Sequence, residues 1–184
     1  LRFDYFELGI NPKNNEVWTS VQVKTFIDQC SDMINDQKLP VQFQQVFGTP
    51  MKLTINYPIS CTYQRKFMVE QMPVNCCLLM DKGAISGQYQ IYINEHKVDT
   101  FEHRFVYDNS NLISDILPYL KKGENTLRIE VNVEHDWDGV VDALYLSGDF
   151  GITINEEQHP ILTCASTNSS LHQGPYTSYP YYAG

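Results

Sequence analysis

The feature that most constrains the fold is a strict alternation of apolar and polar residues over Thr126–Glu134. In an extended strand, successive side chains point to opposite faces, so the four aliphatic residues of this run share one face. They are Leu127, Ile129, Val131 and Val133. Such a strand covers a core with one face and meets water with the other. The run lies within a longer stretch, 88–152, in which strand and turn patterns follow one another.

Further strands are predicted on both sides of this run by period-two patterns and short apolar runs. They are Met51–Tyr57, Tyr63–Glu70, Val74–Met80, Gln88–Asn94, Phe101–Tyr107 and Ala143–Ser147. An Asp-Asn-Ser-Asn run at 108–111 and Gly123 predict the start and end of a short helical turn between them. Six to eight short strands with few helices predict a mainly β chain folded as a β-sandwich.

The first fifty residues have a different pattern. Apolar residues at spacings of three and four over Glu16–Asp36 predict one amphipathic helix. We therefore expect a helical extension or linker from a preceding domain at 1–50 and a sandwich at 51–184. Because the chain begins at Leu1 rather than Met, we expect it to be a piece of a longer protein. The tail, 153–184, is expected to lead to a further segment.

Charge and hydropathy exclude two classes of partner. The net charge is -9, and the 13 Lys and Arg residues are scattered, so no nucleic-acid partner is predicted. No apolar run approaches the roughly 20 residues of a membrane span, so no membrane partner is predicted either. The sequence contains no G-x-S-x-G, P-loop or G-x-G-x-x-G motif, and no catalytic residue is predicted.

Cysteine usage indicates the compartment only weakly. The five cysteines are odd in number and include no C-x-x-C pair, which disfavours a zinc knuckle. Buried free thiols are the expected state, and one disulfide is the alternative. Free thiols favour a reducing, cytoplasmic compartment.

One segment has a composition that strands do not require, and it supplies every candidate ligand-binding residue. These are Glu134, His135, Asp136, Trp137 and Asp138. The indole of Trp137 can stack on a sugar face while carboxylates accept hydrogen bonds from hydroxyl groups. The alternative is that Trp137 folds back into the core. Asp136 and Asp138 could share a calcium ion, but the order of ligands in an EF-hand is absent, so a solvated acidic loop is favoured and no metal site is predicted.

Several short segments occur in an order that is typical of one family. They are Tyr92-Ile93-Asn94, Asp115-Ile116, Leu120 and Lys122-Gly123-Glu124-Asn125-Thr126-Leu127. This order resembles the jelly-roll sugar-binding domain of glycoside hydrolase family 2. In that domain a strand ends in an N-G-like turn, a D-I-x-x-x-L helical turn follows, and G-x-N-x-L leads into a long strand. Asn94-Glu95 replaces the N-G dipeptide here.

A narrower resemblance covers the run 138–150, which reads DGVVDALYLSGDF. It is similar to a signature of large proteins related to the family 106 rhamnosidases, in which a Q-G-Y-P-F-Y-x-G segment follows. The end of the chain, 173–184, resembles an interrupted version of that segment.

These resemblances imply a galactose-binding-like jelly roll with a short N-terminal helical extension. They imply a non-catalytic accessory domain of a glycoside hydrolase that contacts carbohydrate through Glu134–Gly139, with the catalytic domain of the same parent chain as its partner. No cofactor is implied. The alternative is a structural module that braces the catalytic domain and binds no sugar. A small independent enzyme is a third hypothesis, and no motif supports it.

Overall fold

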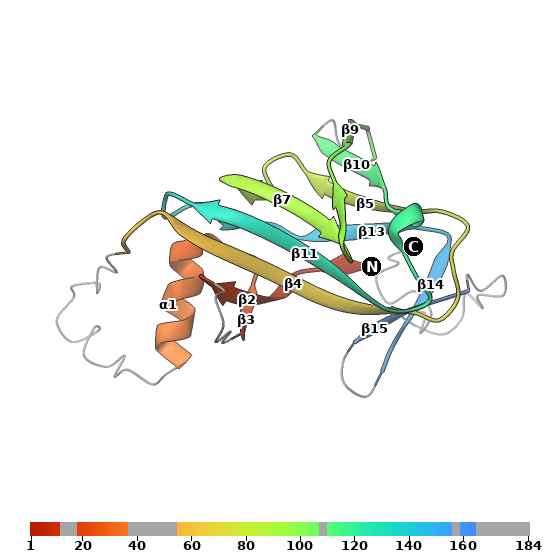
Figure 1. Cartoon of the computed structure of the whole chain (residues 1–184), viewed down its shortest axis with the longest axis horizontal. Helices are drawn as coiled ribbons and strands as arrows, with labels where there is room; N and C mark the ends of the chain where they lie inside the picture. The colour runs from red at the N-terminus through yellow and green to blue at the C-terminus, as the bar shows by residue number, and fades with distance from the viewer. Residues whose placement is uncertain (12–17, 37–54, 107–109, 156–158, 165–184) are drawn as a thin grey trace, which may run out of the picture.

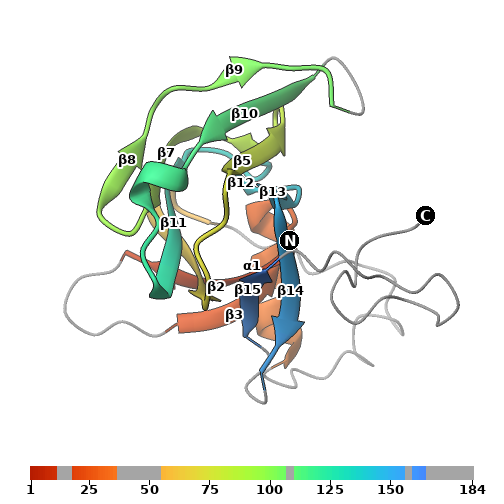
Figure 2. The ribbon, with the colours of Figure 1, turned by 90° about the vertical axis from the view of Figure 1, so that its right-hand side faces the viewer.

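A computed structural model of the chain describes residues 1–11, 18–36, 55–106, 110–155 and 159–164. Its strands form two large sheets and one small one, and a helix lies at one end of the molecule (Figure 1). Figure 2 views the molecule along its long axis, with β9 and β10 of one large sheet at the top and β2 and β3 of the other below. The predicted mainly β sandwich is confirmed.

The larger sheet has eight strands. Its main path runs β14-β15-β4-β11-β7-β8, and β2 joins it by pairing with β4 and with β3. The strands are β2 (Tyr5–Ile10), β3 (Trp18–Gln22), β4 (Ile59–Val69), β7 (Gln88–Ile93), β8 (His96–Val98), β11 (Gly123–Val133), β14 (Phe150–Ile154) and β15 (Pro160–Cys164).

The smaller sheet has five strands in the order β1-β13-β5-β10-β9. They are β1 (Arg2–Phe3), β5 (Cys76–Asp81), β9 (Glu102–His103), β10 (Asn111–Asp115) and β13 (Leu144–Gly148). A two-stranded sheet pairs β6 (Ile85–Ser86) with β12 (Gly139–Val140). The described helices are α1 (Phe26–Asp36) and the 3₁₀ turn η1 (Leu117–Tyr119).

The strand predicted over Thr126–Glu134 is confirmed as β11, and it is the central strand of the larger sheet. It pairs with β4 along its full eleven residues and with β7 on its other edge. Leu127, Ile129 and Val133 are fully buried, as their shared face requires. Burial of such a side chain stabilises the fold by about 1.5–3 kcal/mol relative to leaving it exposed.

The core lies between the sheets. Phe67 and Ile129 from the larger sheet and Leu78 and Leu144 from the smaller one belong to one cluster of buried side chains. The strand predicted at Val74–Met80 is confirmed from Cys76 onward as β5, in the middle of the smaller sheet. Its position between two other strands explains why four of its six residues are buried.

The helical extension expected at 1–50 is confirmed only in part, as the helix α1. β1 pairs with β13 and β2 pairs with β4, so residues 1–10 supply strands to both large sheets. The helix begins only at Phe26, whereas Trp18–Gln22 is a strand. Apolar residues recur at spacings of three and four through both the strand and the helix, so the pattern predicted one continuous helix. Spacing alone does not reveal the bend between Gln22 and Phe26. A domain boundary at residue 50 would separate these strands from the sheets they complete.

The tail expected from residue 153 also begins inside the sandwich. β14 reaches Ile154, and β15 pairs with it and, in parallel, with β4. The Tyr- and Pro-rich end, 173–184, lies outside the described residues. So does most of the strand predicted at Met51–Tyr57, and its described part, from Ile55, is not strand.

The helical turn predicted between residues 108 and 123 is only partly correct. Asn111–Asp115 forms strand β10, which pairs with β5, and only η1 is helical. The pairing supplies β10 with the backbone hydrogen bonds that a helix would otherwise provide. The helical turn ends at Tyr119 with Leu120 in an extended conformation, so Gly123 does not end it as expected. Gly123 does have a positive φ, +96°, at the start of β11, where the Asn125 side chain accepts a hydrogen bond from Lys121 N and donates to Lys121 O and Gly123 O, at 2.7–3.0 Å.

Candidate functional site

The five candidate residues lie on the loop that joins β11 to β12, at the end of the sandwich where α1 packs (Figure 1). Two carbonyl groups of this loop accept the first N–H groups of α1. Ile27 N donates to Asp136 O at 3.1 Å, and Phe26 N donates to Asp138 O at 2.8 Å. The first turn of a helix has N–H groups without partners inside the helix, so these bonds hold the loop and the helix together.

Asp138 is the residue that shapes the loop. It is 3% exposed, and its carboxylate accepts hydrogen bonds from the N–H groups of Glu134 and His135 at 2.9 and 3.0 Å and from the Ser86 hydroxyl at 3.0 Å. Burial favours a higher pKa for this carboxyl group, but these bonds outweigh burial and hold its pKa below the ordinary value of 3.8. Asp138 therefore supports the loop from inside.

Trp137 lies at the surface, and its side chain is 61% exposed. Of the two alternatives left by the sequence, burial in the core is thus wrong. One face of the indole stacks on the imidazole of His135, with ring centroids 4.7 Å apart and planes 10° from parallel. The His135 ring in turn has its Nδ1 3.4 Å from the Asp138 carboxylate. This stack gives the indole a defined orientation on an exposed loop.

The other two acidic residues are exposed. Asp136 accepts a hydrogen bond from the Tyr57 hydroxyl at 2.8 Å, and Glu134 accepts one from the Asn132 amide at 2.9 Å. Burial and the bond to Asp136 both raise the pKa of Tyr57, so its hydroxyl stays protonated as a donor. The loop therefore combines an aromatic face with two exposed carboxylates, each oriented by a neighbouring side chain.

Gly139 allows the loop to enter β12. Its φ is +118°, and a Cβ atom built there would lie 2.9 Å from the Tyr63 hydroxyl. That hydroxyl donates to the buried amide of Gln29, which donates to Gln22 O. The glycine is thus required both by backbone conformation and by the close approach of a buried hydrogen-bond network.

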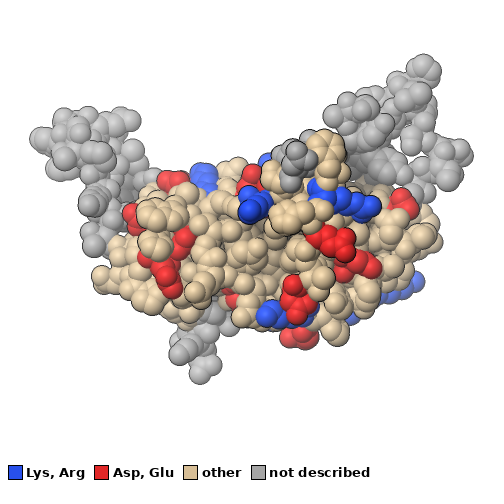
Figure 3. All heavy atoms as spheres, turned by 90° about the horizontal axis from the view of Figure 1, so that it is seen from above, with Lys and Arg blue, Asp and Glu red and all other residues tan. Residues whose placement is uncertain are grey.

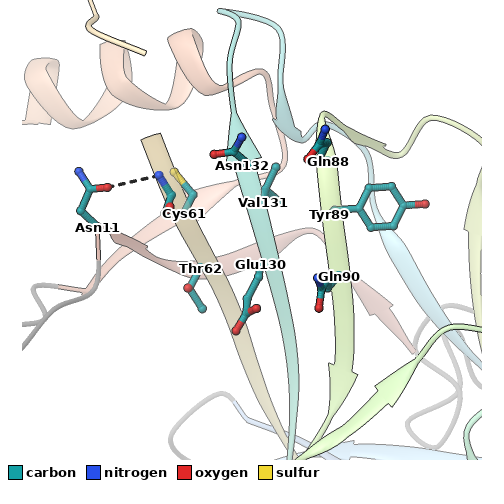
Figure 4. Close-up of a pocket in the computed structure, with 10 residues that line it drawn as sticks. Asn11, Cys61, Thr62, Gln88, Tyr89, Gln90, Glu130, Val131 and Asn132 are labelled. Carbon is teal, nitrogen blue, oxygen red and sulfur yellow. Dashed lines mark hydrogen bonds between the residues drawn. The ribbon is translucent and has the colours of Figure 1, made fainter. Parts of the chain in front are cut away.

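Sequence reasoning missed a second feature, an open groove of about 600 Å³ on the outer face of β4, β11 and β7 (Figure 4). Its polar side chains are Asn11, Ser60, Thr62, Gln88, Gln90, Glu130 and Asn132. Outward-facing polar residues are the norm on a half-buried sheet, so each alone carries no signal. The available signal was the recurrence of amides at alternate positions, in Gln88-x-Gln90 and at Asn132.

The described residues offer little else that could carry chemistry. No group of three or more His, Cys, Asp or Glu in them could hold a metal ion. The cysteines are free, and burial raises the pKa of Cys30 to about 11 and of Cys61 to about 12, which disfavours reactive thiolates. No described helix is long and apolar enough to cross a membrane. On the face seen in Figure 3, Lys and Arg lie in small groups among Asp and Glu.

The sequence matches no protein-family model and no curated protein. Its structure is similar to solved glycoside hydrolases. A β-D-mannosidase from Dictyoglomus thermophilum aligns with a TM-score of 0.51 and 14% identity, covering 85% of this chain and 24% of the enzyme. A glycosyl hydrolase family 2 member from Bacteroides cellulosilyticus aligns with a TM-score of 0.48 and 16% identity, covering 84% and 22%. A β-D-glucuronidase from D. thermophilum aligns with a TM-score of 0.46 and 14% identity, covering 82% and 29%.

The likeness to the mannosidase is one of fold. The resemblance to family 2 glycoside hydrolases is confirmed at that level, and the part of it that concerns family 106 stays a prediction. The chain spans about a quarter of the length of these enzymes.

Proposed function

We propose that this chain is a non-catalytic accessory domain of a larger glycoside hydrolase and that it contacts carbohydrate through the loop Glu134–Gly139. The observation that carries the proposal is the exposed indole of Trp137, stacked on His135 by one face. An aromatic ring held in place is a suitable platform for the apolar face of a sugar ring, because little side-chain freedom remains to be lost on binding.

The carboxylates around the indole have distinct roles in this proposal. Glu134 and Asp136 are exposed and can accept hydrogen bonds from sugar hydroxyl groups. Asp138 acts through the loop, whose conformation it holds from inside. The acid/base and nucleophile of the parent enzyme belong to its catalytic domain, which is also the partner of this chain.

A second candidate is a bracing module that binds no sugar. Phe105 is 70% exposed and Val106 is 45% exposed, next to β9 and away from the loop in the chain. Neighbouring apolar side chains on a surface are typical of contacts with another domain. In this alternative the catalytic domain covers Phe105, and Trp137 belongs to an interface as well.

The test is a glycan array probed with the full 184-residue chain, followed by calorimetry on the sugars that bind. We expect Trp137→Ala to weaken binding about tenfold or more, and Trp137→Phe to retain most of it, because Phe keeps an aromatic face. Phe105→Ala is the matched control, since it removes another exposed aromatic ring and should leave the affinity unchanged.

Two results would overturn the proposal. A folded chain that binds no glycan on the array favours the bracing module. Hydrolysis of an aryl glycoside by this chain alone would show that it is catalytic.

A further inference from the structure

The groove on the larger sheet is built from two cross-strand rows. Strand register places Thr62, Glu130 and Gln90 side by side in one row. It places Ser60, Asn132 and Gln88 in the next row, nearer the end of β11 that leads to the loop. In Figure 4 the labelled side chains of these rows stand on the strands β4, β11 and β7, and the Tyr89 ring points away from them. The labelled members are Thr62, Glu130, Gln90, Asn132 and Gln88.

Gln90 is oriented by its neighbours. The Tyr92 hydroxyl donates to Gln90 Oε1 at 2.6 Å, and the Arg128 guanidinium lies over the Tyr92 ring, 4.1 Å from its centroid. Arg128 also pairs with Glu130. Because Gln90 Oε1 accepts from Tyr92, its amide nitrogen is directed away from that bond as a donor. Within the part of the chain that the structure describes, this nitrogen has no hydrogen-bond partner.

Asn132 connects the groove to the loop. Its amide nitrogen donates to the Glu134 carboxylate at 2.9 Å, which leaves its Oδ1 as an acceptor in the groove. The groove therefore presents an oriented donor on β7 and an oriented acceptor on β11. The row that contains Asn132 lies next to the loop that carries Trp137, because Asn132 is two residues before Glu134.

The chemistry of the lining selects the kind of ligand. No Lys or Arg is among the described residues that line the groove, which disfavours phosphate and nucleic acid. Its one carboxylate, Glu130, is paired with Arg128, so a cation gains little there. Amide groups both donate and accept hydrogen bonds, as sugar hydroxyl groups do. A volume of about 600 Å³ is within the range of small-molecule sites.

We infer that this groove binds further units of a neutral oligosaccharide whose first unit stacks on Trp137. The inference rests on the proposed function and extends it, because it assigns the ligand class (a neutral chain rather than a single sugar) and a direction along β11. The hydrogen bond between Asn132 and Glu134 is the point at which the two parts of the surface meet.

Calorimetry with neutral β-1,4-linked manno- and gluco-oligosaccharides of one to six units tests the inference on the full chain. We expect the affinity to rise about tenfold or more between one unit and four. Gln90→Ala should weaken binding of the tetrasaccharide about five- to tenfold, the equivalent of one lost hydrogen bond, and leave the monosaccharide unaffected. Asn132→Ala also removes the hydrogen bond that orients Glu134, so it should weaken binding of both sugars. Gln64→Ala is the matched control, because Gln64 lies on β4 outside the groove lining.

The outcomes separate the two proposals. If Trp137→Ala abolishes all binding and the wild-type affinity does not rise with the length of the oligosaccharide, the loop binds sugar and the inference about the groove is wrong. If Gln90→Ala weakens binding of the tetrasaccharide and Trp137→Ala leaves that affinity unchanged, the groove binds sugar and the proposal for the loop is wrong. A folded chain that binds none of the oligosaccharides overturns both.

Discussion

Burial decides the roles of the acidic residues in the loop. Asp136 and Asp138 are two positions apart and both suit a ligand-binding loop by composition, yet Asp136 is exposed and Asp138 is buried. In a strand, a spacing of two would place them on the same face. In the loop that regularity fails, because Asp138 turns inward to accept backbone N–H groups while Asp136 meets Tyr57. Sequence could identify the loop but could not assign these roles.

We expect Asp138→Ala to lower the free energy of unfolding by about 2–3 kcal/mol at pH 7, because it leaves buried donors without an acceptor. Urea denaturation followed by circular dichroism measures this. Glu134→Ala is the control in the same loop. It removes one exposed hydrogen bond and should cost no more than about 0.5 kcal/mol. Equal effects of the two substitutions would contradict a supporting role for Asp138.

The stabilities of wild type and Asp138→Ala should also depend differently on pH. The pKa of Asp138 is lower in the folded chain than its ordinary value of 3.8, so its carboxylate stabilises the fold fully above that value. This contribution is lost as the pH falls through the lower, folded pKa. The difference in stability between wild type and Asp138→Ala should therefore shrink below pH 3.8 and stay constant between pH 5 and 7.

At the scale of elements, the alternation of β11 was sufficient to predict a strand and its buried face. Capping signals were not sufficient at 108–115, because strand pairing with β5 is a contact with a distant part of the chain. The groove was missed for the same reason. Gln90, Glu130 and Thr62 become neighbours only through strand register, which no local pattern contains.

The entry of the loop into β12 depends on Gly139. We expect Gly139→Ala to destabilise the chain by about 2–4 kcal/mol, from a positive φ and from the contact with the Tyr63 hydroxyl together. Gly83→Ala is the matched control, because Gly83 has a φ of +94° but nothing within 4 Å of an added Cβ, so only the backbone term of about 1–2 kcal/mol applies. Urea denaturation of both variants measures the difference. If Gly83→Ala costs as much as Gly139→Ala, the close approach to Tyr63 is unimportant.

At the scale of the whole molecule, the first ten residues hold the sandwich together. β1 belongs to the smaller sheet and β2 to the larger one, and their partners lie far along the chain, at β13 and β4. The sequence predicted a helical extension here and did not reveal these strands, because pairing with distant strands leaves no pattern in a short window of sequence. The buried residues of this segment join both sheets to one core. They are Phe3, Phe6 and Leu8.

This arrangement predicts that the N-terminal strands are required for folding. Phe6 is 1% exposed and meets the Tyr63 ring edge-on, with centroids 6.3 Å apart, whereas its neighbour Tyr5 is 48% exposed. We expect Phe6→Ala to lower the free energy of unfolding by about 3–5 kcal/mol and Tyr5→Ala to change it by no more than about 0.5 kcal/mol. Urea denaturation compares the two, and equal costs would place β2 outside the core.

A shortened chain tests the same point more severely. A chain that begins at Met51 lacks β1, β2, β3 and α1, so it exposes part of one edge of β4 and opens the core between the sheets. We expect it to lose the near-ultraviolet circular dichroism of packed aromatic rings and to unfold without cooperativity. Cooperative unfolding of that chain at the stability of the full chain would restore a domain boundary at residue 50. Phe6→Ala is expected to leave the backbone pairing of β2 intact. If both Phe6→Ala and the shortened chain lose stability, folding requires the buried side chains of the N-terminal segment as well as its backbone pairing.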